Sequence, residues 1–388
     1  MLAHSPPLPL VIDCQYDGIT AKDQKALILA LAQRDRVRRI RLSLPVLKLQ
    51  KLIKAIDGEY PILEYLILMD PPKDKNTVII LSETLQTPHL RHLVIDGSIP
   101  IRSPLLGTAA GLVNLYLTLH HPSTYFQPAA LLQSLSLVPQ LELLLIYFHF
   151  SVPDRDVERQ LTRTPIMTHV TLPNLRFFAF QAVSIYSEAV LSRITSPHLE
   201  MFQICYLQQL TFSVPELLQF VRRTESLRFD RAKFYFESSR VYVEVNPPEN
   251  NMSADIFSII VHCSPIGWQV SSVAQIFNGL SQISSAVEHL TFSYEAHSWT
   301  SEQHDEVERT EWRKLLRSFS NVRTLRIHRG LVGELSRSLE LEDGEHPLEL
   351  LPELHVLTYT WSGNVHYAFT SFVDARKNAG RPVTLIKS

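Results

Sequence analysis

Apolar residues recur along the chain in one spacing, L-x-x-L-x-I, separated by polar or small residues. Residues 87–97, TPHLRHLVIDG, show this spacing with Leu90, Leu93 and Ile95. The second and third apolar residues lie two positions apart, so in a strand both point to the same face. The residues between them point to the opposite face. The pattern therefore predicts a strand with one face buried in a core and the other directed outward.

The same spacing returns many times. Successive clear copies are 26, 27, 22, 29, 34 and 24 residues apart. Intervals of roughly 20 to 30 residues are typical of leucine-rich repeats, in which one coil cannot bury its apolar face but stacked coils share a core. The clear copies start at Val37, Leu63, Leu90, Leu112, Leu141, Leu175 and Leu199, and weaker ones start at Leu227, Val287, Val322 and Leu354.

Helical patterns alternate with these strands. Thr20 and Asp23 resemble a capping pair at the start of a helix over residues 20–34. The segment SVPE at residues 213–216 is typical of a capping box, with proline just inside another helix. Further helices are predicted over residues 46–56, 125–137, 154–161, 184–194, 269–284, 302–318, 331–339 and 366–377.

This alternation predicts parallel strands joined by right-handed connections. We expect an α/β fold, a right-handed leucine-rich-repeat solenoid or horseshoe, with parallel strands on its concave face and helices on its convex face. Residues 1–388 would form a single domain of about 11–12 irregular repeats. Residues 231–265 interrupt the rhythm with three period-2 runs separated by turn residues. We interpret that segment as a β insertion, a meander that replaces one ordinary coil.

The residues between the core positions would lie on the concave face. In the middle repeats these residues are apolar and aromatic, and such a patch is typical of protein-binding surfaces. Two alternatives stay open: helices or loops cover the patch, or the register slips by one residue there. The central outward column reads Arg41, Ile67, Val94, Tyr116, Leu145, Ala179, Gln203, Arg228, Thr291, Arg326 and Thr358. The predicted partner-binding residues are Tyr116, Leu143, Leu145, Tyr147, Phe177, Arg228 and Arg326.

The composition of the chain is typical of a soluble globular protein. The chain has 388 residues, of which 45% are hydrophobic and 20% charged, with a net charge of −2. This balance gives no general attraction to nucleic acid or to acidic lipid. No apolar run approaches the roughly 20 residues of a membrane span, and the N-terminus lacks the pattern of a signal peptide. We expect a cytoplasmic or nuclear monomer, and the sparse cysteines Cys14, Cys205 and Cys263 fit a reducing compartment.

Patterns that carry chemistry are missing from the sequence. It contains no dinucleotide, P-loop, metalloprotease, serine hydrolase or calcium-loop motif. The doublet His120–His121 precedes Pro122, where we expect a solvated turn rather than a metal site. Five arginines between Arg34 and Arg41 form a basic cluster. We interpret this cluster as a solvated helix end, and the alternative is a contact for phosphate or an acidic peptide. We therefore predict no catalytic residue, no metal and no cofactor.

Several segments, in order, resemble the leucine-rich region of F-box proteins from mushroom-forming fungi. They are TPHLRHLVIDG, LPNLRFFAFQAVS, TFSVPELLQFVRRTESLRFDRAKF, EWRKLLRSFSNVRTLRI and NAGRPVTLI, and the likeness covers nearly the whole chain. In that family an N-terminal F-box docks on a Skp-type linker of a cullin ubiquitin ligase, and the repeat region selects the protein to be ubiquitinated. The resemblance implies that this chain binds an unknown protein substrate.

The F-box itself is not recognisable. In that family it is a three-helix module that starts with L-P-x-E-[IL]. Residues 214–218, VPELL, and 351–354, LPEL, each lack the residue between proline and glutamate. A strand is expected almost at the start, near Leu8, which leaves no room for the module. We expect a truncated product, an isoform or a stand-alone repeat protein, with a Skp-type linker as partner only if an F-box exists upstream.

The leading hypothesis is a non-catalytic protein–protein interaction module related to the substrate-recognition region of F-box subunits. The alternative is a stand-alone leucine-rich-repeat scaffold with no role in a ubiquitin ligase. Two further readings are a hydrolase whose site is scattered over the solenoid and a folded relic without a partner. Nucleic acid and membrane are not expected partners.

Overall fold

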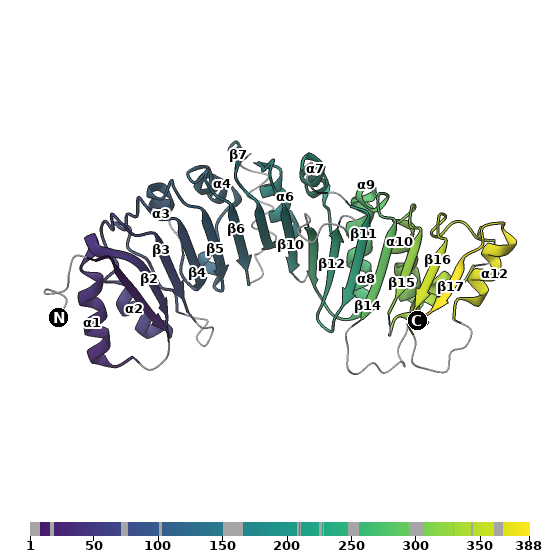
Figure 1. The fold of residues 1–388 in the computed structure, drawn as a ribbon, viewed down its shortest axis with the longest axis horizontal. Coiled ribbons are helices and arrows are strands. Elements are labelled where there is room, and N and C mark those ends of the chain that lie inside the picture. Colours follow the sequence, from purple (N-terminus) through teal and green to yellow (C-terminus); the bar gives the residue numbers. More distant parts are fainter. Residues whose placement is uncertain are drawn as a thin grey trace. The chain divides into compact units, whose positions relative to one another are not determined.

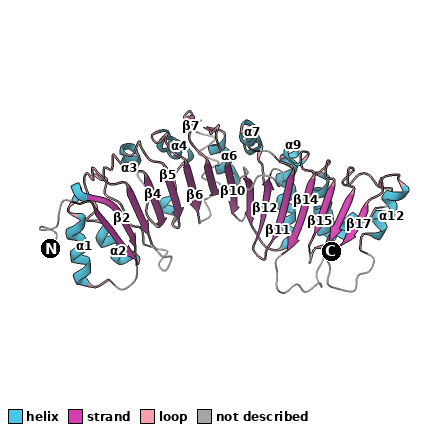
Figure 2. Ribbon diagram, viewed as in Figure 1, coloured by secondary structure: helices cyan, strands magenta, loops and turns pink. Residues whose placement is uncertain are grey.

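The recurring segments form strands of a mixed α/β fold with a large, mostly parallel sheet (Figure 2). The expected α/β class and the predominance of parallel strands are thus confirmed. The chain divides into two compact units, residues 1–199 (unit 1) and 200–388 (unit 2). The computed structural model describes residues 8–15, 19–70, 77–100, 103–149, 166–207, 209, 211–224, 227, 229–246, 256–294, 306–328, 330–342, 344–360 and 368–388.

In unit 1 the strands pair in parallel in chain order (Figure 1). They are β1 (Leu10–Gln15), β2 (Val37–Ser43), β3 (Tyr65–Met69), β4 (His92–Gly97), β5 (Asn114–Leu119), β6 (Leu143–Phe148) and β8 (Phe177–Ala182). A separate two-stranded sheet pairs β7 (Val170–Thr171) with β9 (Ile194–Thr195). The copies of the apolar spacing from Val37 to Leu175 therefore become neighbouring strands.

The helices of unit 1 connect successive strands. They are α1 (Ala21–Leu31), α2 (Val46–Ile53), α3 (Ser103–Thr108), α4 (Pro128–Ser136) and α6 (Ser184–Leu191), with 3-10 turns at Arg34–Arg36 and Pro122–Thr124. The capping box of Thr20 and Asp23 is confirmed, because each side chain bonds the other residue's backbone N–H. Helix α3 was missed by the periodicity because it is only 6 residues long. The helix predicted at 154–161 lies outside the described residues.

The apolar positions of the spacing form two buried rows across unit 1. Every residue in both rows is fully buried, so each side chain contributes about 1.5–3 kcal/mol of hydrophobic stabilisation. The rows consist of Ile40, Leu66, Leu93, Leu115, Leu144 and Phe178, and of Leu42, Leu68, Ile95, Leu117, Ile146 and Phe180. The inward face predicted from the sequence is thus the core of this unit.

In unit 2 the spatial order of the strands departs from chain order. It runs β10-β13-β12-β11-β14-β15-β16-β17. Strand β12 is antiparallel to β11 and β13, while β13 pairs in parallel with β10 and β11 with β14. The strands are β10 (Met201–Leu207), β11 (Arg231–Phe236), β12 (Arg240–Asn246), β13 (Ile256–His262), β14 (His289–Tyr294), β15 (Thr324–Ile327), β16 (Val356–Tyr359) and β17 (Thr384–Lys387).

A tight turn accounts for the reversal. The Glu237 N–H donates to the Arg240 carbonyl at 2.9 Å, which closes the connection between β11 and β12 and leaves them antiparallel. The weak strand copy predicted at Leu227–Phe229 is wrong, because neither residue is in a strand and β11 begins at Arg231. The reversed hairpin therefore lies inside the sheet of unit 2, because β13 pairs with β10 and β11 pairs with β14.

The helices of unit 2 are α7 (Pro215–Arg223), α8 (Ile266–Gly279), α9 (Ser281–Ser284), α10 (Glu306–Arg317), α11 (Val332–Leu339) and α12 (Thr370–Asn378). The capping box predicted at residues 213–216 is wrong. Helix α7 is capped by Val214, without a side-chain hydrogen bond, and Pro215 is its first residue. Proline fixes the helix start there, so Ser213 lies one residue too early to cap it.

Aromatic rings fill much of the core of unit 2. The Phe234 ring centroid lies 5.1 Å from that of Phe292 and 5.3 Å from that of Phe277. The Phe236 ring lies 5.3 Å from the buried indole of Trp312 on α10. Phe234, Phe236 and Phe292 occupy inward strand positions where unit 1 uses mainly leucine, whereas Phe277 and Trp312 come from helices α8 and α10. Helix α10 is thereby held against the strands, and their opposite face is left for other contacts.

Candidate functional site

The outward column predicted for the first strands forms a continuous line in unit 1. Residues Arg41, Ile67, Val94, Tyr116, Leu145 and Ala179 occupy matching positions on β2, β3, β4, β5, β6 and β8. A slip of one residue would have turned these side chains into the core. The register predicted from the sequence is therefore confirmed for this stretch.

Five of the predicted partner-binding residues come together on three neighbouring strands. Tyr116 pairs with Leu145, and Leu143 pairs with Phe177. The rings of Tyr116 and Tyr147 meet edge to face, with centroids 6.4 Å apart. We call Tyr116, Leu143, Leu145, Tyr147 and Phe177 the apolar patch. Of the other predicted residues, Arg228 lies outside the described residues, and Arg326 lies in unit 2.

The apolar patch is unevenly accessible. Leu145 is only 7% exposed, whereas Tyr116, Leu143, Tyr147 and Phe177 are half-buried. On the outward face Leu145 has Tyr116 beside it on β5, Ala179 beside it on β8, and Leu143 and Tyr147 along its own strand. Leu145 therefore adds little accessible area, and the four half-buried side chains offer the contact area.

A row of stacked polar groups continues from the patch toward the start of the unit. The Arg39 guanidinium lies 5.6 Å from the Tyr65 ring centroid, and the Tyr65 and His92 rings stack at 4.3 Å. The Asn114 amide nitrogen lies 2.8 Å from Nδ1 of His92. Burial, together with Arg91, lowers the pKa of His92, so its imidazole is neutral at pH 7. The row is therefore pre-organised and carries charge only at its Arg39 end.

The two histidines of the doublet have different partners. His120 Nε2 lies 2.8 Å from Oδ1 of Asp96, and its ring stacks on His149 with centroids 4.8 Å apart. His121 instead accepts the N–H of Ser123 at 3.1 Å. Across the described ranges, no three His, Cys, Asp or Glu side chains converge as metal ligands would.

The arginines near the start of unit 1 are partly engaged by acidic side chains. Arg38 lies 2.9 Å from Glu64, and Arg34 lies 3.9 Å from Asp57. Arg39 and Arg41 lie in outward columns of β2, as expected. Because acidic side chains already compensate part of this positive charge, we do not assign an anion-binding site to these arginines.

Unit 2 has a hollow of about 320 Å³ on the outward face of its sheet. Outward side chains of β11, β14, β15 and β16 line it. They include Arg231, Lys233, His289, Thr291, Thr324, Arg326 and Thr358, which we call the basic hollow. The predicted residue Arg326 is one of them, whereas Lys233 takes the central position that the sequence interpretation gave to Arg228.

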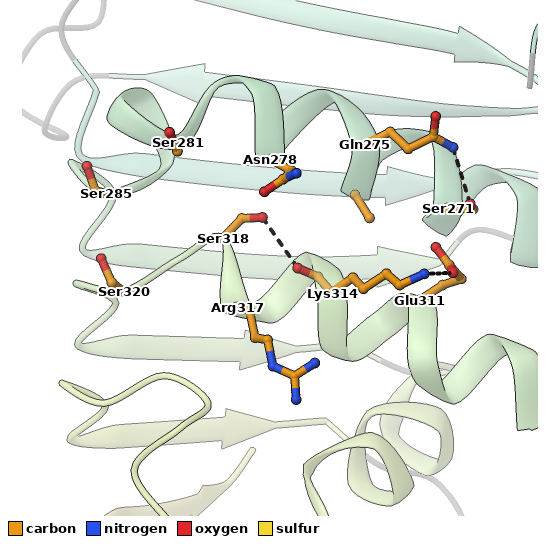
Figure 3. A pocket seen from close by; sticks show the side chains of 11 residues that line it. Ser271, Gln275, Asn278, Ser281, Ser285, Glu311, Lys314, Arg317, Ser318 and Ser320 are labelled. Atoms are coloured by element: carbon orange, nitrogen blue, oxygen red, sulfur yellow. Dashed lines mark hydrogen bonds and ion pairs between the residues drawn. The ribbon is translucent and has the colours of Figure 1, made fainter. Parts of the chain in front are cut away.

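A larger hollow of about 640 Å³ lies on the helix side of unit 2 (Figure 3). Helices α8 and α10 pass side by side there, and serines and amides line much of it. Its charged groups are paired: Lys314 lies 2.6 Å from Glu311, and Arg317 lies 2.8 Å from Glu349. This compensation leaves little charge for a ligand, so the basic hollow is the stronger candidate.

Among the described residues, the cysteines are free thiols. Burial raises the pKa of Cys205 to about 12, which leaves almost no thiolate at neutral pH. None of the helices in the described ranges combines the length and hydrophobicity needed to cross a bilayer. No protein-family model matches the chain, and a search of curated proteins finds no matching relative.

Proposed function

We propose that the chain is a non-catalytic module that binds another protein through the outward face of its sheet. The observation that carries this proposal is the apolar patch, in which four half-buried apolar and aromatic side chains adjoin on β5, β6 and β8. Aromatic side chains on rigid strands give contact area at low entropic cost. Tyrosine is enriched among residues that dominate interface energies.

The finer architecture belongs to the same proposal. We propose that the whole chain is one leucine-rich-repeat solenoid of about 11–12 irregular repeats, with strands on the concave and helices on the convex side. In-register strands and fully buried rows support it in unit 1. The reversed hairpin of β11 and β12 would be an insertion in that array.

The resemblance to F-box proteins supports a more specific role. We propose that this chain is the substrate-recognition region of an F-box subunit, with a Skp-type linker as partner where an F-box precedes it. The alternative role is a stand-alone scaffold with no part in a ubiquitin ligase. Both roles use the same binding face. They differ in whether the protein also binds a Skp-type linker.

Mutagenesis of the apolar patch tests the binding role. A partner is first isolated on the immobilised chain from a fungal lysate, identified and produced in pure form. The double variant Tyr147→Asp/Phe177→Asp should then bind it at least about tenfold more weakly, because both side chains belong to the half-buried group that offers the contact area. Leu145 is not chosen, since a charge at that buried position would also unfold the chain.

A matched control carries the same number of charges elsewhere. Leu47 and Ile80 are 67% and 56% exposed in unit 1, so Leu47→Asp/Ile80→Asp should retain the partner. Equal affinity of the patch variant and this control would disprove the site. The ligase role is tested separately with products of longer transcripts. A product that captures a Skp-type linker and the partner together supports the receptor, and partner binding without any linker supports the scaffold.

A further inference from the structure

The basic hollow brings together cations from strands far apart in the sequence. Lys233 on β11 pairs with Thr291 on β14, which pairs with Arg326 on β15 and then with Thr358 on β16. Arg231 lies two residues before Lys233 on the same face. Strand and residue spacings place the backbone of Lys233 roughly 6.6 Å from that of Arg231 and roughly 9.6 Å from that of Arg326, while Arg231 and Arg326 are roughly 12 Å apart on the diagonal.

Two of these cations are not compensated by acidic side chains. Among the described residues, no carboxylate lies within 4.0 Å of the Lys233 ammonium or the Arg326 guanidinium. Glu244 is the register partner of Lys233, but its carboxylate accepts the amide of Asn246 instead. Only Arg231 has an acidic neighbour, Asp230, at 3.9 Å. The hollow thus holds excess positive charge.

Neutral donors accompany this charge. Thr291 and Thr358 line the hollow, and within the described part of the chain their hydroxyls make no hydrogen bond. The Thr324 hydroxyl bonds His289 Nδ1. Burial and the neighbouring Arg326 lower the pKa of His328 at the end of β15, which agrees with a positive local field. Hydroxyl groups without a hydrogen-bond partner, placed beside cations without a nearby carboxylate, are suited to binding oxyanions.

We propose that the basic hollow binds an extended acidic segment of a protein partner, with carboxylates seated between Lys233, Arg326 and Arg231. This inference deepens the proposed binding function and rests on it. Alternate side chains of an extended segment lie about 6.6 Å apart, which matches the separation of Arg231 and Lys233 on β11. A volume of about 320 Å³ holds about ten waters at roughly 30 Å³ each, enough for two carboxylates.

Nucleic acid fits the hollow less well. Duplex DNA carries one charge per about 1.7 Å and is bound by long basic tracks. Here the cations span only about 12 Å, and Asp230, Glu244 and Glu288 lie on the surrounding strand ends. The chain as a whole has a net charge of −2. The charge pattern therefore favours a short acidic segment of a protein.

The test measures binding of fluorescent decapeptides to the full chain at low salt. One pool alternates glutamate with serine, a second replaces each glutamate with glutamine, and a third carries phosphoserine at alternate positions. The glutamate pool should bind at least about tenfold more tightly than the glutamine pool, and each of Lys233→Gln and Arg326→Gln should weaken it about tenfold, as for hydrogen bonds to charged groups. Raised salt should weaken it further.

A control removes two positive charges elsewhere in unit 2. Arg381→Gln/Lys387→Gln changes residues outside the hollow and should leave peptide affinity intact. Tight binding of the phosphoserine pool would identify phosphoryl groups as a further source of the same oxyanion. Equal affinity for the glutamate and glutamine pools, unchanged affinity in the hollow variants, or tighter binding of an oligothymidylate of equal charge would each overturn the inference.

The two proposals fail separately. Should the isolated partner depend on Tyr147 and Phe177 but bind equally well to Lys233→Gln/Arg326→Gln, the acidic-segment inference is wrong while the binding function stands. Should the partner ignore Tyr147 and Phe177 while the glutamate peptides still require Lys233 and Arg326, the apolar patch is wrong and the hollow remains.

Discussion

Helix α10 allows a sharp test of buried against exposed ion pairs. Its residues Arg313 and Arg317 lie one turn apart and pair with Glu345 and Glu349, respectively. The side chains of Arg313 and Glu345 are 3% and 7% exposed, whereas those of Arg317 and Glu349 are both 43% exposed. We predict that Glu345→Gln destabilises unit 2 strongly and that Glu349→Gln does not.

The magnitude follows from how Arg313 is held. Its Nη1 donates to the carbonyls of Ser338 and Glu340 at 2.7 and 2.9 Å, so the guanidinium cannot turn to water when its carboxylate is removed. Glutamine retains an acceptor but leaves the buried cation with only the exposed carboxylate of Glu342, 3.7 Å from its Nε, as a counter-charge. The expected loss is about 2–4 kcal/mol, between a charged hydrogen bond and a broken buried pair. The exposed pair should lose less than about 1 kcal/mol.

Thermal unfolding and hydrogen exchange of α10 and residues 332–345 measure both variants. Equal losses in the two variants would refute the reasoning, because burial would then not determine the strength of the pair. The pH gives a second check. Burial raises the pKa of Glu345, but the Glu342 N–H and Arg313 outweigh it, and the net pKa is lowered.

The sign of the pH effect follows from this lowered pKa. A carboxylate with a lower pKa in the folded state stabilises the fold above its unfolded pKa and loses that contribution as the pH falls through the folded value. The stability difference between wild type and Glu345→Gln should stay constant from pH 8 to about pH 5. It should shrink at lower pH, and a difference that widened on acidification would contradict the assignment.

Two further predictions concern the core and a thiol. Leu93→Ala should lower the free energy of unfolding of unit 1 by about 2–5 kcal/mol, whereas Val94→Thr on the outward face should cost less than about 1 kcal/mol, as measured by chemical denaturation; similar losses would contradict the assignment of faces. Cys205, whose pKa is raised to about 12 by burial, should resist iodoacetamide at pH 8 until the chain is unfolded, while half-exposed Cys14 should react first, as peptide mass mapping will show.

The inward face could be predicted because its signal is local and repeated. Each copy of the spacing carries its own period-2 pair, such as Leu93 and Ile95, and every such pair faces the core of unit 1. A shift of one residue would expose the whole set, so the sequence strongly specifies the register. The same logic correctly placed Tyr116 opposite Leu145.

Accessibility on the outward face could not be predicted in this way. Period-2 alternation states only that Leu145 points away from the helices. Whether solvent reaches it depends on the bulk of its neighbours on the adjoining strands, and these come from separate parts of the chain. Leu145 is 7% exposed, whereas Arg326 at the equivalent place in unit 2 is exposed.

The greatest gap between sequence and structure lies in the order of the strands. A copy of the spacing at Leu227 would have placed Arg228 on the outward face, but that copy is too weak to form a strand, and the next one begins at Arg231. The hairpin then turns β12 back, so that β11 pairs with β14 and Lys233 lies beside Thr291. The reversed hairpin leaves the apolar pattern within each strand unchanged. It changes which strands lie next to one another. The basic hollow is a product of that pairing: its cations share no motif, and only the sheet brings them to one place.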